Sequence, residues 1–301
     1  MANARALDKR RKSVRNVRKI TRTMELIATA KFKKAMDRAI AATSYTQRIT
    51  QLVNSLADAG LEVSHPLLEE RKSTGKAVLL VLSPNRGLCG GYIGAVLRTA
   101  IPHISVLRGQ YDALQLEVTG KRGISAMKFR GIIPDETFLE FDDQPRFHEV
   151  DKIAVRYLDA YMKGEVDRVD VVYTKFISSS KQIATLETLL PLGSLGDDSE
   201  TKQDKKKDND RPAGNLDYEF LPSAESILKE VVPTSFKVKL FKCFLDAAVS
   251  EQIARMVAMK AATDNAGDMI RMLSRTYNRA RQSQITNEIM EVISGSEALS
   301  G

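Results

Sequence analysis

The stretch Ser250-Glu251-Gln252-Ile253-Ala254-Arg255-Met256-Val257-Ala258-Met259-Lys260-Ala261-Ala262 consists mostly of residues that favour helices. It belongs to a longer segment, residues 236–299, which contains no proline and whose only glycine before Gly295 is Gly267. This segment is therefore predicted to be one long helix. Apolar residues recur along it in steps of three and four, which is the spacing of a seam packed against a partner helix. These residues are Ala266, Met269 or Ile270, Leu273, Tyr277 and Ala280.

A partner helix is predicted at the other end of the chain. Residues 3–56 also lack glycine and proline. The residues at three- and four-residue spacing predict a second coiled-coil strand, although Lys31 interrupts the apolar series and Thr21 weakens it. We expect the two terminal helices to fold back on each other; their relative direction does not follow from this spacing. The predicted seam positions are Val14, Val17, Thr21, Met24, Ala28, Lys31 and Ala35.

Between the helices the hydrophobic pattern changes to that of an α/β domain. The continuous apolar run at residues 76–82 is typical of a buried parallel strand. Alternation of strands with helices predicts a mostly parallel sheet. The further strands are expected at 112–118, 137–141, 169–176 and 183–190, and the helices at 92–104, interrupted late by Pro102, at 121–130 and at 150–163.

Three segments follow from these patterns. Residues 1–60 are predicted to be the N-terminal coiled-coil helix, 61–222 the central α/β domain, and 223–301 the C-terminal coiled-coil helix. Residues 193–216 are charged and lack apolar anchors, which predicts a mobile surface loop within the central domain. Pro233 is expected either to end a short helix or to begin the long one.

The charge is concentrated at the N-terminus. Residues 1–40 carry thirteen lysines and arginines against three acidic residues, a net charge of +10, whereas the whole chain carries +8. Such a basic helix can be a solvated face, a nucleic-acid or membrane binder, or a helix inside an acidic protein cavity. Nucleic acid is the less favoured partner, because few aromatic residues lie among the cations and the helix already has an apolar seam.

Catalytic motifs are not evident in the sequence. The glycine-rich stretch Gly87-Leu88-Cys89-Gly90-Gly91-Tyr92-Ile93-Gly94 follows a predicted strand but matches neither GxGxxG nor GxxxxGK[ST]. We expect its glycines to let a tight turn and a helix approach the sheet, rather than to hold a ligand. Cys89 and Cys243 have no metal-ligand spacing and are expected to be reduced and buried. No cofactor or metal site is predicted, and a mechanical or connective role is favoured over a small-molecule enzyme.

Four separated stretches closely resemble the gamma-subunit family of F-type ATP synthases, in the family's order and over essentially the whole chain. They are Lys19-Ile20-Thr21-Arg22-Thr23-Met24-Glu25, Arg86-Gly87-Leu88-Cys89-Gly90-Gly91, residues 250–265, and Ile285-Thr286-Asn287-Glu288-Ile289-Met290-Glu291-Val292-Ile293-Ser294-Gly295. The resemblance implies an antiparallel coiled coil of the terminal helices and a central Rossmann-like domain with a mostly parallel sheet.

The resemblance also implies a function. The chain would be the non-catalytic central rotor stalk that couples rotation of the membrane c-ring to changes at the catalytic sites of the beta subunits. It would also regulate ATPase activity and proton flow. The implied partners are the alpha, beta, epsilon and delta subunits and the c-ring, with one gamma copy per complex and neither nucleic acid nor direct membrane insertion. The absence of a transit peptide pattern and of a regulatory cysteine pair favours a bacterial protein at the cytoplasmic face of the inner membrane.

Individual positions follow from the motif match. Met24 lies where the family meets the lever loop of beta, and Arg255 lies in the family's C-terminal helix segment. Arg281 and Gln282 carry donors suited to carboxylates. The loop before residue 217 differs from the family's foot loop in length and charge. The implied alpha and beta contacts are Met24, Arg255, Arg281, Gln282, Thr286 and Glu288, and the implied foot contacts with the c-ring and epsilon are Asp217, Tyr218 and Glu219.

Overall fold

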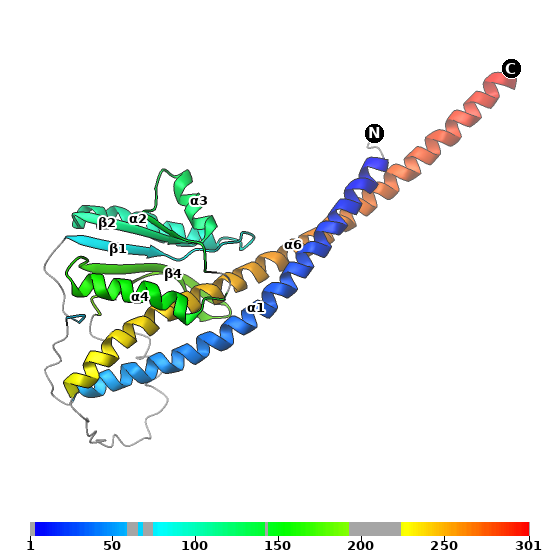
Figure 1. Ribbon diagram of the computed structural model, residues 1–301. Coiled ribbons are helices and arrows are strands. Elements are labelled where there is room, and N and C mark those ends of the chain that lie inside the picture. Colours follow the sequence, from blue (N-terminus) through cyan, green and yellow to red (C-terminus); the bar gives the residue numbers. More distant parts are fainter. Residues whose placement is uncertain (1–3, 59–65, 69–74, 142–143, 193–223, 301) are drawn as a thin grey trace. The chain divides into compact units, whose positions relative to one another are not determined.

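The computed structural model describes residues 4–58, 66–68, 75–141, 144–192 and 224–300. Two long helices, α1 (Ala4–Asp58) and α6 (Ala224–Ser300), precede and follow the strands along the chain (Figure 1). The chain divides into two compact units. The helix-pair unit contains residues 1–30, 88–90 and 254–301, and the sheet unit contains residues 31–87 and 91–253.

The sheet of the sheet unit is mostly parallel, as predicted. Its order is β3-β2-β1-β4-β5. The first four strands of that order run parallel to their neighbours, whereas β5 is antiparallel to β4. The third strand is shorter than the predicted 137–141 segment. The strands are β1 (Lys76–Val81), β2 (Ala113–Thr119), β3 (Glu136–Phe138), β4 (Arg168–Ser178) and β5 (Lys181–Leu190).

Helices cover both faces of this sheet. On one face, Val78 and Val171 pack in a core with α4 (Phe147–Met162). On the other face lies α2 (Tyr92–Gln110), whose His103 Nε2 is 2.7 Å from the Asp170 carboxylate of β4. Successive strand residues point to opposite faces, so these contacts place the two helices on opposite sides. The remaining short helix is α3 (Lys121–Phe129), which contacts α2.

Pro102 and Pro233 both lie inside helices, although the sequence patterns predicted that each would interrupt one. Helix α2 continues through Pro102 to Gln110, and α6 continues through Pro233. The prediction that Pro233 ends or begins a helix was therefore wrong. An internal proline costs about 3 kcal/mol of helix stability. Near Pro233, Val232 and Phe236 are fully buried in the sheet core, and that packing keeps the helix continuous.

The first part of α6 is an integral part of the sheet unit. Its Leu240 and Phe244 belong to the same core as β1, β4 and α4. The Phe244 ring lies 4.8 Å from the ring of Phe141 between centroids. Lys237 Nζ forms a 2.9 Å salt bridge with Asp151 of α4. Among the described residues, no helix combines the length and the apolar character needed to cross a bilayer.

Candidate functional site

In the helix-pair unit, α1 and α6 run antiparallel. The Thr21 and Thr263 hydroxyls are hydrogen-bonded at 2.8 Å. The Arg11 guanidinium lies 4.7 Å from the centre of the Tyr277 ring. Arg11 lies nearer the start of α1 than Thr21, whereas its partner Tyr277 lies nearer the end of α6 than Thr263. The two helices therefore run in opposite directions, which confirms the direction implied by the family resemblance.

The seam of this pair contains small and polar residues. Ala28 is 1% exposed, and Glu25 is buried although its Oε2 atom has no hydrogen-bond partner in the described structure. Gly267 of α6 leaves room for the Arg18 guanidinium, which packs beside it. The buried seam residues are Thr21, Glu25 and Ala28 of α1 and Met259, Thr263, Ala266 and Leu273 of α6.

Two predicted seam positions are wrong. Val17 is 48% exposed and Met24 is 37% exposed, so neither lies in the buried seam. The sequence contains two apolar series on neighbouring faces of one helix, and the prediction merged them. Glu25, the residue after Met24, lies in the buried seam. A search for apolar residues does not find a glutamate at such a position.

The second apolar series forms an exposed stripe on α1. Its members are spaced by three, four and three residues and therefore share one helix face. Exposed large apolar side chains in a row are typical of a surface that another protein covers. The sequence analysis assigned a partner contact to Met24 alone in this set, although the spacing would have revealed the others. The apolar stripe consists of Val17, Ile20, Met24 and Ile27.

The predicted contacts on α6 fall into two groups. Arg255 is half-buried. Further along, Arg281, Gln282, Thr286 and Glu288 are exposed to solvent. Thr286 Oγ1 donates a 3.0 Å hydrogen bond to the Gln282 carbonyl oxygen, and Glu288 accepts a 2.9 Å bond from Gln284. The guanidinium of Arg281 and the side-chain amide of Gln282 are exposed donor groups.

The predicted foot contacts and loop lie outside the described residues. These are Asp217, Tyr218 and Glu219 and the loop at 193–216.

In the helix-pair unit, the glycine-rich turn packs on helix α6 at Gly90. Gly90 has a φ angle of +56°, and a Cβ atom there would lie 3.6 Å from the Ala258 Cβ. Glycine is the residue that adopts this backbone conformation without strain. Leu88 also has a positive φ, of 63°, and is 60% exposed. Cys89 between them is buried, and neither Cys89 nor Cys243 forms a disulfide.

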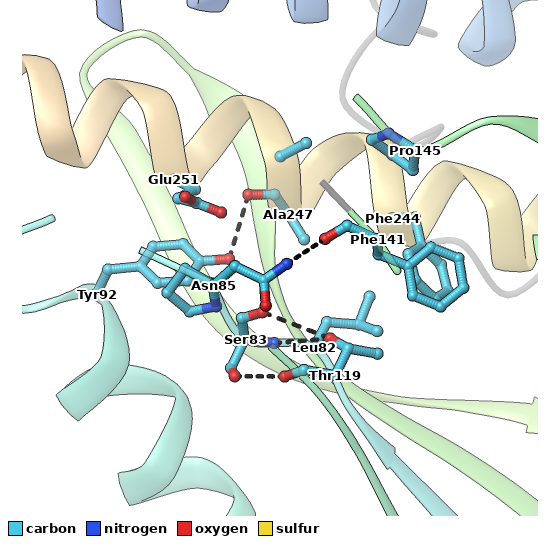
Figure 2. Close-up of a pocket in the computed structure, with 12 residues that line it drawn as sticks. Leu82, Ser83, Asn85, Tyr92, Thr119, Phe141, Pro145, Phe244, Ala247 and Glu251 are labelled. Carbon is cyan, nitrogen blue, oxygen red and sulfur yellow. Dashed lines mark hydrogen bonds between the residues drawn. The ribbon is translucent and has the colours of Figure 1, made fainter. Parts of the chain in front are cut away.

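At the carboxyl edge of the parallel strands, where α/β folds often bind nucleotides, the sheet unit is filled by its own side chains (Figure 2). The remaining cavity is about 40 Å³, which is room for little more than one water molecule. Helix α6 lines it with Phe244, Ala247, Ala248 and Glu251. The Tyr92 hydroxyl donates a 3.2 Å hydrogen bond to the Ala247 carbonyl oxygen.

The amide groups that could hold a phosphate are bonded internally. At the start of α3, the Gly123 amide donates to Ser83 Oγ at 3.0 Å, and the Lys121 amide donates to Asn85 Oδ1 at 3.1 Å. The Arg122 amide donates to the Pro84 carbonyl oxygen at 3.1 Å. The loop after β1 thus takes the place that a phosphate takes at helix N-termini of nucleotide-binding folds.

A buried carboxylate in the sheet unit also has internal partners. Burial raises the pKa of Glu117, a feature that is common at acid–base sites. Its Oε2 accepts a 2.6 Å hydrogen bond from the Tyr157 hydroxyl and a 2.5 Å bond from Arg156. Its Oε1 accepts a 2.7 Å bond from Gln115. These contacts assign Glu117 a structural role between β2 and α4.

The comparisons with known proteins agree along the chain. A family model described as ATP synthase matches residues 3–299. The protein named ATP synthase gamma chain from Rhodopirellula baltica is 66% identical over 301 residues, with 100% of both chains covered. The one from Leptospira biflexa is 36% identical over 300 residues, again with 100% of both chains covered.

Solved structures with the same fold come from mitochondrial ATP synthases. A chain in the Euglena gracilis OSCP/F1/c-ring structure, rotational state 3, has a TM-score of 0.63 at 19% identity, covering 98% of this chain and 94% of that one. A chain in the rotor structure of the same enzyme has a TM-score of 0.60 at 17% identity, covering 94% of this chain and 98% of that one.

Proposed function

Because the chain belongs to the ATP synthase gamma-chain family, we propose that it is the central rotor stalk of a proton-translocating ATP synthase. It couples rotation of the membrane c-ring to conformational changes at the catalytic sites of the beta subunits, and it regulates ATPase activity and proton flow. The observation that carries this proposal is the 66% identity to a gamma chain over the full length of both proteins.

The helix pair suits this role physically. Two antiparallel helices joined by a seam of small residues form an element that other subunits can grip. Arg15, Arg18 and Arg22 lie on another face of α1 than the apolar stripe, so a rotating pair presents different chemistry to each surrounding subunit. A rotor shifts the conformations of those subunits only through such differences in interaction free energy.

The contacts expected from the family match are part of this proposal. Met24, as a member of the apolar stripe, and Arg255 contact the alpha and beta subunits. Farther along α6, Arg281, Gln282, Thr286 and Glu288 do the same. The cations of residues 1–40 suit an acidic collar by charge complementarity. Asp217, Tyr218 and Glu219 belong to the foot that contacts the c-ring and epsilon.

The remaining assignments are also proposals. The chain itself does not catalyse, and one copy joins the alpha, beta, delta and epsilon subunits at the cytoplasmic face of the bacterial inner membrane. Its three functional segments are residues 1–60, 61–222 and 223–301. A small-molecule enzyme is the less favoured alternative, because the cavity at the carboxyl edge measures only about 40 Å³.

Gentle solubilisation of the source membranes tests the main proposal. The chain should purify with stoichiometric alpha, beta and epsilon subunits, and purification without them would contradict the main proposal.

The contact assignment is tested by the double variant Arg281→Ala with Gln282→Ala, in which we expect reduced coupled ATP synthesis. The matched control is Arg275→Ala, which removes an exposed arginine elsewhere on the same helix. Unchanged assembly and synthesis in the double variant would refute the assignment.

A further inference from the structure

The end of α3 presents two of the most exposed apolar side chains in the described structure. Phe129 is 91% exposed and Ile133 is 74% exposed. The turn between them is held by backbone hydrogen bonds. The Arg130 and Ile132 amides donate to the Met127 carbonyl oxygen at 2.9 and 3.0 Å, and the Gly131 amide donates to that of Lys128 at 3.0 Å. The backbone that carries these two apolar side chains is therefore fixed by hydrogen bonds.

The same segment is strongly basic. Residues 121–131 include Lys121, Arg122, Lys128 and Arg130 and no acidic residue. None of these four cations forms a salt bridge within the described part of the chain. Arg122 precedes Phe129 by seven residues, or two helical turns, and so lies on the same helix face.

The acidic residues that follow this segment in the chain have other partners. Asp135 Oδ2 accepts a 2.7 Å hydrogen bond from the Leu116 amide, and Glu136 is paired with Arg156. They do not neutralise the cations of α3. The surface formed by Arg122, Lys128, Phe129, Arg130 and Ile133 is named the basic α3 surface.

We propose that the basic α3 surface docks an acidic segment of another protein, with Phe129 as the apolar anchor. A fixed aromatic group surrounded by cations suits a partner pocket with a carboxylate rim. An anionic membrane is the less suitable partner. Residues 41–301 carry a net charge of −2, since residues 1–40 hold +10 of the total +8. This part of the chain therefore lacks the broad positive charge that attracts proteins to anionic lipid. The inference adds a partner site in the sheet unit, beyond the helix and foot contacts proposed above.

Photo-crosslinking in native membranes tests the proposal. Phe129 is replaced with p-benzoylphenylalanine in the full chain, and the same replacement at exposed Lys163 serves as the control position. After irradiation, we expect a protein adduct at position 129 whose crosslinked peptide carries aspartate or glutamate beside apolar residues. The yield should be roughly tenfold above that at position 163, as expected for a specific contact worth more than 1 kcal/mol.

Charge variants then test the electrostatic part. Lys128→Glu with Arg130→Glu should lower the yield at position 129 by roughly tenfold, because like charges would face each other. Lys128→Arg with Arg130→Lys keeps both charges and should preserve it. A lipid adduct, an adduct with a second copy of this chain, a yield no higher than at position 163, or a yield insensitive to charge reversal would each overturn the proposal. Subunit copurification is scored separately, so failure of the rotor assignment is distinguishable from failure of this docking site.

Discussion

The hydroxyl of Thr21 lies 2.8 Å from the hydroxyl of Thr263, across the seam between the two terminal helices. Each hydroxyl also lies near a carbonyl oxygen of its own helix, that of Arg18 at 3.1 Å and that of Met259 at 2.8 Å. The pair joins residues separated by 242 positions in the sequence. A buried polar contact of this kind is satisfied in only one register of the helix pair, and so it selects that register over a slipped one.

Removing this contact should loosen the pair locally. Thr263→Val keeps the shape and removes the hydroxyl, and we expect a loss of about 1 kcal/mol of local stability. Amide hydrogen exchange of residues 14–28 in the full chain should quicken accordingly. In a double-mutant cycle with Thr21→Val, the second change should add little. Thr23→Val, which removes an exposed hydroxyl that bonds the Lys19 carbonyl oxygen of its own helix, should leave exchange nearly unchanged. Equal effects of Thr23→Val and Thr263→Val would contradict a seam-specific role.

Much of the fold could be predicted from the sequence, because its local signals agree with its packing. The apolar run at 76–82 became β1 in the middle of a parallel sheet. The absence of glycine and proline from residues 3–56, and of proline from residues 236–299, corresponds to α1 and α6. Ala266 and Leu273, predicted from spacing alone, are buried in the seam.

The errors arose where tertiary packing overrides local preference. Pro233 lies within α6 because its buried neighbours Val232 and Phe236 hold the helix in the sheet core. Spacing could not tell which apolar series faces the partner, and so Val17 and Met24 were placed in the seam. The residues that fill the carboxyl edge of the sheet, such as Ser83 and Ala247, come from segments far apart in the sequence. No local sequence pattern reveals that they lie together.

Two glycines with similar backbone angles should tolerate alanine very differently. Gly120 has φ of +80°, and a Cβ there would lie 2.1 Å from the Ser83 carbonyl oxygen. Gly131 has φ of +75° with nothing within 4 Å. Gly131→Ala should therefore cost only backbone strain, about 1 kcal/mol. Gly120→Ala adds a clash with backbone and should cost about 3 kcal/mol or more. Urea denaturation of the full chain, followed by circular dichroism, measures both. Similar urea midpoints for the two variants would contradict the close contact between Gly120 and the loop that follows β1.

The stability contributions of two carboxylates, the buried Glu117 and the half-buried Glu187, should respond to pH in opposite directions. Burial acts to raise the pKa of Glu187, but Lys239, 3.1 Å away, and the Tyr173 hydroxyl outweigh it and lower that pKa below its ordinary value of 4.5. A lowered pKa contributes stability above the ordinary pKa and loses it as pH falls. The free energy of unfolding should therefore decrease from about pH 5 to about pH 3, and less steeply in Glu187→Gln.

The contribution of Glu117 to stability should change with pH in the opposite direction. Because burial raises its pKa above 4.5, its contribution is greatest below pH 4.5 and is lost as pH rises through the raised value. Glu117→Gln should remove that loss, so its stability relative to the parent chain should improve from acid toward neutral pH. Urea titrations of both variants between about pH 3 and pH 7 measure these slopes. Parallel pH profiles for Glu117→Gln and Glu187→Gln would contradict the assigned contacts.

The apolar stripe of α1 should matter for assembly more than for folding. Ile20 and Ile27 are 55% and 51% exposed, so Ile20→Ser with Ile27→Ser should leave the helix content of the chain unchanged. If alpha and beta subunits cover the stripe, each truncation removes about 1 kcal/mol of apolar burial from the complex. The double variant should then bind purified alpha and beta subunits about 30-fold more weakly, as measured by reconstitution titrations. Leu26→Ser is the matched control, since Leu26 is 55% exposed on another face of the same helix. An affinity equal to that of the parent chain, or an equal loss in Leu26→Ser, would mean that the stripe is not the surface that those subunits grip.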